Sequence, residues 1–275
     1  MKIRNVMLSL AIIPSLLLAG CGKDDNNTNN DQIQYSEVSK TDALSYINGA
    51  KENNNLIINS YEFNMTAAMP RDFETLDSFE SSENSLFPDV SDATKWDKAY
   101  TSGTIIDGET LEAKFEINEP EDITYSVYIK DNKVYMNTSE GKYMTSYEGT
   151  EELEYIEITS EMPSAEDLLE QLDMINSVES GLKFEKAEKD GKIYYHISGL
   201  AIIDEENEFG SFNMEIPIDL HLTFENDKLV SYKYKTMMLF VYMEFEVNLT
   251  TTPIEFPEDL DTYIENDDIF FEEFE

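Results

Sequence analysis

Few side chains in this sequence are of the types that carry out catalysis, and none of them stands in a catalytic motif. Ser139 and Lys142 have the Ser-x-x-Lys spacing of penicillin-binding enzymes, and residues 82–84 have the matching Ser-x-Asn. Ser139, however, falls in a predicted hairpin and not at a helix start. The order of the two motifs is also reversed, and no Lys-Thr-Gly follows. We therefore interpret the match as chance.

The two histidines are the other candidates for proton transfer or metal ligation. His196 alternates with Tyr194 and Ser198 on the polar face of one predicted strand, and His221 lies on the polar face of another. Both are interpreted as surface residues. No His-Glu-x-x-His, Gly-rich phosphate loop or Gly-x-Ser-x-Gly occurs. Carboxylates are so abundant that no pair stands out. The sequence thus predicts no enzyme, no metal site and no cofactor.

The N-terminus carries the strongest functional signal. Lys2 and Arg4 precede an apolar run over residues 6–18, and a Leu-Ala-Gly-Cys sequence then ends at Cys21. The run is short for a transmembrane helix and typical of a signal peptide. This segment resembles the lipobox of bacterial lipoproteins. The resemblance implies cleavage before Cys21 and diacylglycerol on its sulfur, which anchors the chain to the extracytoplasmic face of the cell membrane.

The overall charge limits the partners of the chain. Its 275 residues include 19 basic and 58 acidic ones, a net charge of -39, which becomes -41 without the leader 1–20. Such a field repels nucleic acid and anionic head groups and attracts cations or a basic protein. Residues 21–35 hold the lipidated cysteine and an Asn/Asp-rich tether with a reach of roughly 20 Å. Since Cys21 is the only cysteine, no intramolecular disulfide forms.

The rest of the chain predicts one β-rich domain over residues 36–265, followed by an acidic tail over 266–275. Capping boxes at Ser39 and Ser164 begin two expected helices, the second with an apolar stripe that ends before Gly181. Period-two alternation predicts half-buried antiparallel strands near 57–67, 109–118, 123–129, 214–224 and 240–250. Pro217 suggests a sheet edge or a bulge in its strand. Asp131-Asn132, Asp190-Gly191 and Asn226-Asp227 predict tight hairpins.

Two sets of residues are candidates for a ligand site. The first is the apolar face of the last strands: Ile216, Ile218, Leu220, Leu222, Val241, Met243, Phe245 and Leu249. The second is a lid formed by the acidic, aperiodic segment 70–96, which carries Phe73, Phe79, Phe87 and Trp96. The same residues are also compatible with an ordinary filled core and a plain loop, and the sequence leaves both alternatives open.

The order of these elements resembles the LolA/LppX-like lipoprotein family of the Gram-positive type. The resemblance is carried by the hairpin VYIKDNKVYMNTSEGKYM at 127–144 and the closing segment TTTPIEFPEDLDTY at 250–263. It implies an α+β, β-rich fold in which a curved, unclosed antiparallel β-barrel wraps around a few helices. It also implies a non-catalytic protein that binds a lipid or another apolar ligand. The alternative is a cell-surface interaction module whose acidic surface recognises a basic protein.

Overall fold

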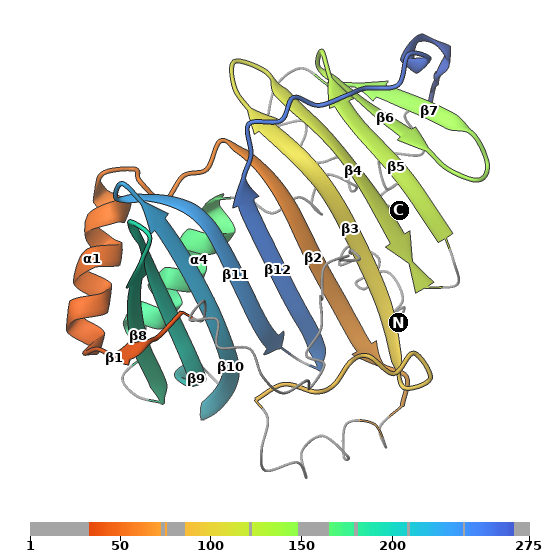
Figure 1. Cartoon of the computed structure of the whole chain (residues 1–275). Helices are drawn as coiled ribbons and strands as arrows, with labels where there is room; N and C mark the ends of the chain where they lie inside the picture. The colour runs from red at the N-terminus through yellow and green to blue at the C-terminus, as the bar shows by residue number, and fades with distance from the viewer. Residues whose placement is uncertain are drawn as a thin grey trace, which may run out of the picture.

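The computed structural model describes residues 33–72, 75, 86–120, 123–147, 165–178, 181–207, 210–238 and 240–266. Within these ranges the chain forms a single 13-stranded sheet and two α-helices, and every helix and strand falls inside the predicted domain 36–265 (Figure 1). The strand order is β1-β8-β9-β10-β11-β12-β2-β3-β4-β5-β6-β7-β13. The end strands β1 and β13 do not pair with each other, so the sheet is open. This confirms the predicted α+β, β-rich class with a curved, unclosed sheet.

The first half of the chain supplies one helix and one flank of the sheet. Its elements are β1 (Ser36–Glu37), α1 (Lys40–Glu52), β2 (Ser60–Pro70), β3 (Trp96–Asp107), β4 (Leu111–Glu119), β5 (Ile123–Lys130), β6 (Lys133–Asn137) and β7 (Lys142–Ser146).

The second half supplies the other helix and the other flank. Its elements are α4 (Ala165–Ser177), β8 (Leu182–Lys189), β9 (Lys192–Asn207), β10 (Gly210–Glu225), β11 (Lys228–Met238), β12 (Val241–Leu249), a 3-10 turn (Leu260–Thr262) and β13 (Ile264–Glu265). Strand β12 joins the two flanks because it pairs with both β11 and β2. The closing segment then crosses to β7, where β13 makes the one parallel pair among the described strands.

The predicted helix signals and turn signals are confirmed where the structure describes them. Ser39 caps α1, since its hydroxyl accepts a hydrogen bond from the Asp42 amide at 3.1 Å. The three predicted hairpins are two-residue turns in which both central residues have positive φ, the conformation that such turns require. At Pro217, β10 pairs with β9 alone among the described strands, because β11 pairs with β10 only from Ile218 onward. Its missing N–H is therefore tolerated.

The sheet has an inner face, which carries both helices, and an outer face, which Figure 1 presents to the viewer. Both helices pack apolar side chains into the core. These are Ala43, Leu44, Ile47 and Ala50 from α1, and Leu168, Leu172, Ile175 and Val178 from α4. Both helices lie over the β8–β11 flank (Figure 1). They are tied together by the Lys51–Asp173 ion pair at 2.6 Å, and to β11 by the Tyr234 hydroxyl, which donates to Gln171 at 2.7 Å.

Candidate functional site

The inner face is apolar from one flank of the sheet to the other. The register places one row of side chains side by side across nine strands: Phe184, Ile197, Leu220, Tyr234, Phe245, Met65, Thr101, Ile117 and Tyr125. Directly opposed residues of antiparallel strands share a face, so these side chains form one continuous surface. The alternation predicted from the sequence therefore produces a single apolar face and not separate clusters.

The β10 candidates do not line open space. Ile216, Ile218, Leu220 and Leu222 are each 3% exposed or less, and they belong to the same core as Leu172 and Ile175 of α4. Their burial in this core offers no open surface to a ligand in this structure, and ligand contact by these residues stays a prediction. They are core residues of the covered flank.

The β12 candidates behave differently, because no described helix lies above them. Val241, Met243 and Phe245 are only half-buried, and Leu249, at the other end of β12, is 50% exposed. Ala99 of β3 and Ile123 and Tyr125 of β5 are likewise incompletely buried on this face. We call the six residues Val241, Met243, Phe245, Ala99, Ile123 and Tyr125 the inner-face strip. They lie at the end of the sheet where β12, β3 and β5 begin, which is the lower end of each of these strands in Figure 1.

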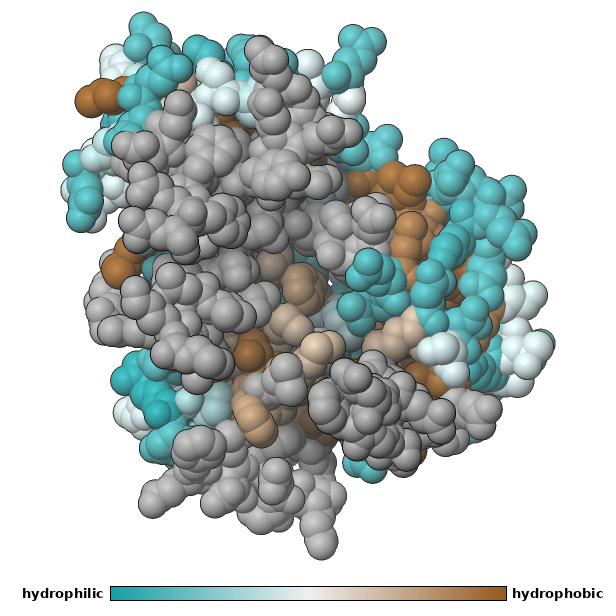
Figure 2. All heavy atoms as spheres, turned by 180° about the vertical axis from the view of Figure 1, so that it is seen from behind, coloured by the Kyte–Doolittle hydropathy of each residue, from teal (hydrophilic) through white to brown (hydrophobic). Residues whose placement is uncertain are grey.

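One polar group stands beside the strip. Thr236 of β11 pairs with Met243 and is 2% exposed, and within the part of the chain that the structure describes its hydroxyl, although close to Tyr234, makes no hydrogen bond of normal geometry. A buried polar group without a partner is energetically costly, so it marks a place where a ligand atom would be stabilised. Figure 2 shows this side of the molecule, with apolar residues visible in the middle of the face and hydrophilic residues towards its edges.

The two lid candidates that the structure describes, Phe87 and Trp96, do not lie over the strip. Phe73 and Phe79 fall outside the described residues. Trp96 and Phe87 pack with Ala68 and Tyr242, and the register places Ala68, Trp96 and Tyr242 on the outer face. Phe87 meets the ring of Tyr242 with the centroids 6.1 Å apart. The lid prediction is therefore corrected for Phe87 and Trp96, which hold the segment before β3 against the outer face.

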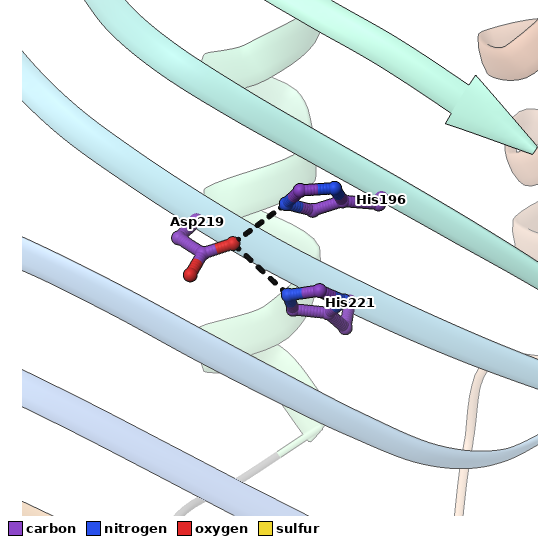
Figure 3. Close-up of side chains that lie close together, drawn as sticks. All are labelled: His196, Asp219 and His221. Atoms are coloured by element: carbon purple, nitrogen blue, oxygen red, sulfur yellow. Dashed lines mark hydrogen bonds and ion pairs between the residues drawn. The ribbon is translucent and has the colours of Figure 1, made fainter. Parts of the chain in front are cut away.

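A second cluster of chemically capable side chains lies on the outer face of β9 and β10. His196 and His221 face each other across the two strands and their rings stack, with centroids 4.1 Å apart and planes 8° apart. The Nε2 atoms of His196 and His221 lie 2.8 and 3.0 Å from the same oxygen, Oδ1 of Asp219 (Figure 3). On its other side, Nδ1 of His196 lies 3.1 Å from Oε2 of Glu185.

The charges of this cluster stabilise one another. The hydrogen bond to Asp219 raises the pKa of His196, and Glu185 adds to this, whereas burial opposes it. Burial alone would raise the pKa of Asp219, but the hydrogen bonds from both histidines outweigh it and hold that pKa far below its usual range. The pKa of Glu185 is lowered chiefly by its hydrogen bond from Lys183 at 2.7 Å. The cluster is thus an ordered ionic network on a partly exposed surface.

Sequence reasoning placed both histidines on polar faces but missed that they meet. The polar faces of β9 and β10 follow from alternation, which predicts a face and not a neighbour. The signal that could have joined them is the position of the turn between β9 and β10, since that turn fixes the register of the two strands. This turn could not be located within the acidic sequence between residues 204 and 210.

The Ser-x-x-Lys residues form no catalytic site with other described residues. Ser139 lies in the turn between β6 and β7, and Lys142 is engaged in an ion pair with Asp259. Residues 82–84, Cys21 and the tail from 267 onward are outside the described residues. Among the helices that the structure describes, neither has the length and apolar character needed to cross a membrane.

Comparisons with known proteins add only distant similarities. No family model matches the chain, and no curated protein matches it. The chain is similar to the crystal structure of lipoprotein LppX of Mycobacterium tuberculosis, with 10% identity and a TM-score of 0.40 over 79% of this chain and 99% of that one. It is also similar to a putative outer membrane lipoprotein-sorting protein domain from Vibrio parahaemolyticus, with 8% identity and a TM-score of 0.25 over 80% and 96%. Both are of the kinds named by the LolA/LppX-like resemblance.

Proposed function

We propose that this chain is a non-enzymatic, extracytoplasmic lipoprotein that binds a lipid or another apolar ligand along the inner-face strip. The observation that carries the proposal is the contrast within the inner face: an apolar row crosses it from β8 to β5, with Glu119 beside Ile123 at one end of the strip, yet described helices cover only the β8–β11 flank. Partly exposed side chains such as Met243, Phe245 and Ala99 then mark where an apolar ligand can take the place of a covering helix.

The energetics favour an acyl chain as the ligand. Each methylene group removed from water contributes about 0.8 kcal/mol, so a chain of ordinary length laid along the strip gains several kcal/mol. A lipid also carries a hydroxyl, ester or carboxyl group. The unpartnered hydroxyl of Thr236, beside Met243, suits such a polar end. Its single hydrogen bond would fix the depth at which the ligand lies.

The proposed location follows from the N-terminus. We propose that two acyl chains on Cys21 hold the protein at the outer surface of the bacterial cell membrane, since two chains give stable anchoring where one is marginal. The tether over residues 22–34 then holds the strongly acidic body within roughly 20 Å of the lipid surface. This distance would let the strip exchange a ligand with the membrane.

A pair of variants on one strand tests the proposal. The chain from Gly22 onward is mixed with a fluorescent fatty acid, and its affinity is measured for wild type, Ala99→Leu and Ser102→Leu. Ala99 and Ser102 lie on opposite faces of β3, so the same side chain is added inside or outside. Ala99→Leu should weaken binding by about tenfold because it fills the strip. Ser102→Leu should leave binding unchanged.

Two results would overturn the proposal. One is the absence of saturable fatty-acid binding by the wild-type chain. The other is an equal loss of affinity in Ala99→Leu and Ser102→Leu, since this would place the probe away from the inner face. Circular dichroism of both variants shows whether each is folded, so that a loss of binding is read only from a folded chain.

The alternative role, recognition of a basic protein by the acidic surface, stays a prediction. Its support is the net charge of -39. Salt separates the two roles, because attraction between exposed charges is screened within about 10 Å at ordinary ionic strength, whereas apolar burial is not. A protein partner captured at low salt and released at high salt would favour the alternative.

A further inference from the structure

We propose that His196, Asp219 and His221 form a binding site for one divalent transition-metal ion, of which Zn²⁺ is the representative. The site lies on the outer face of β9 and β10 and is independent of the ligand role proposed for the inner face. In Figure 3 the two imidazole rings and the carboxylate converge on one point, and one ligand atom from each residue lies within 4.8 Å of the others.

Two of the three separations between these atoms are slightly shorter than those within a coordination shell. Zinc ligands lie about 2.0–2.1 Å from the metal, so in a tetrahedral site neighbouring ligand atoms are roughly 3.3 Å apart. The two Nε2–Oδ1 separations are 2.8 and 3.0 Å. Small movements of the rings would therefore admit the ion, which would replace the ring protons that now point at Asp219.

The arrangement behind His196 supports a ligand role. A metal-bound histidine almost always donates its second ring N–H to a carboxylate or carbonyl, which fixes the ring and raises its basicity. Nδ1 of His196 lies 3.1 Å from Glu185, and Glu185 is itself held by Lys183 at 2.7 Å. The ring of Tyr35 packs edge-on against His196 with the centroids 5.7 Å apart. The first ligand is thus already oriented with Nε2 towards the shared site.

The ligand types select the class of ion. Two imidazole nitrogens and one carboxylate oxygen suit zinc, cobalt, nickel or copper, whereas calcium and magnesium prefer all-oxygen shells. The side chains of His196, Asp219 and His221 are 21%, 23% and 38% exposed. The ion could therefore enter from solvent and complete its shell with water. Bound there, it would join two neighbouring strands through side chains of both.

Because the protein surface is strongly acidic, the binding experiment must exclude weak binding of cations to carboxylates alone. The full chain is prepared without a histidine tag, in detergent, and is freed of metal with a chelator. Zn²⁺ is then titrated calorimetrically at high salt and with excess Mg²⁺, which saturates sites made only of carboxylates. His221→Gln removes one ligand. Glu246→Gln, on the outer face but outside the cluster, removes a charge and serves as the matched control.

The expected result is one Zn²⁺ per wild-type chain. His221→Gln should weaken its binding by at least about tenfold, and Glu246→Gln should leave it unchanged. A second readout needs no variant. The chain has only two histidines, so nitrogen-15 labelling of histidine gives two ring systems in the NMR spectrum, and both should shift together and saturate at one equivalent. Zinc binding that leaves both rings unshifted, or that is equally tight in His221→Gln, would overturn the proposal.

Discussion

The two faces of β9, β10 and β11 carry alternate residues of the same strands and behave in opposite ways. On the inner face, Leu220 lies between Ile197 and Tyr234 and is fully buried. One residue further along β10, on the outer face, His221 lies between His196 and Lys233 in an ionic network. The inner residues need only apolar neighbours, whereas the outer residues need particular partners at particular distances.

The alternation of apolar and polar residues determines which face of the sheet a side chain lies on. The pairing register determines which side chains of neighbouring strands it meets. Any register that keeps Leu220 on the inner face buries it against other apolar side chains. Only the register observed here brings both histidines to Asp219. Hydrophobic burial is non-directional, but hydrogen bonds and metal ligation fail when an atom is displaced by an ångström or more. The inner face therefore gives stability, and the outer face gives a specific site.

The largest loss of stability is expected for Leu220→Ala, which truncates a side chain that is fully buried beneath the helices. The loss of transfer free energy and the cavity left behind should lower the free energy of unfolding by about 3 kcal/mol. Urea denaturation followed by tryptophan fluorescence measures it. A loss below about 1 kcal/mol would mean that the inner face of the covered flank is not a close-packed core.

The second largest loss of stability is expected for Gly103→Ala, which tests how closely β3 and β4 approach each other. A Cβ atom added at Gly103 would meet the Lys114 carbonyl oxygen and the Phe115 Cβ well inside van der Waals contact. Both are too rigidly held to move freely, so we expect a loss of about 2 kcal/mol in unfolding free energy. Gly108→Ala is the control, because its added Cβ meets only an ordinary contact at 3.8 Å. Equal stability of the two variants would contradict the close approach.

Asp219→Asn tests the outer-face network directly. The variant keeps the shape of the side chain but loses the charge that accepts hydrogen bonds from both histidines. Because these groups are partly exposed, the expected loss is about 1–2 kcal/mol, smaller than that of Leu220→Ala. Thermal or chemical unfolding measures it. A loss larger than that of Leu220→Ala would reverse the comparison between the two faces.

Glu244→Gln should cause the smallest loss of unfolding free energy, and this loss should depend on pH. Burial alone would raise the pKa of Glu244, but hydrogen bonds from Lys233 at 2.6 Å and Tyr242 at 2.5 Å lower it below the usual 4.5. A carboxylate with a lowered pKa contributes stability that is complete above its unfolded pKa and is lost as pH falls through the folded one. At neutral pH the variant should lose about 1 kcal/mol.

The pH dependence supplies the control for that prediction. Between neutral pH and the acid range below 4.5, wild type should lose more unfolding free energy than Glu244→Gln, because only wild type has this carboxylate to protonate. Parallel curves for the two proteins over that range would show that Glu244 makes no ionic contribution on the outer face.

The sequence predicted the parts of the molecule that depend on local chemistry. Ser39 and the Asp-Asn, Asp-Gly and Asn-Asp turns follow from which residues cap helices or accept positive φ, and alternation placed Leu220 inside and His221 outside. It could not predict which inner residues the helices cover, so alternation alone does not separate Ile218 and Leu220 from Met243 and Phe245 as candidate ligand contacts. Nor could it place Trp96 and Phe87 on the outer face, since an aromatic residue in an aperiodic segment has no defined side.

The inner-face strip is tested most directly by what the protein carries from its own membrane. The full chain is purified in mild detergent from cells that make wild type, Ala99→Leu or Ser102→Leu, and its bound lipids are extracted and measured by mass spectrometry. We expect about one apolar ligand per chain in wild type and Ser102→Leu, and a clear reduction in Ala99→Leu. Chains that carry no ligand, or the same amount in all three proteins, would contradict a ligand site on the inner face.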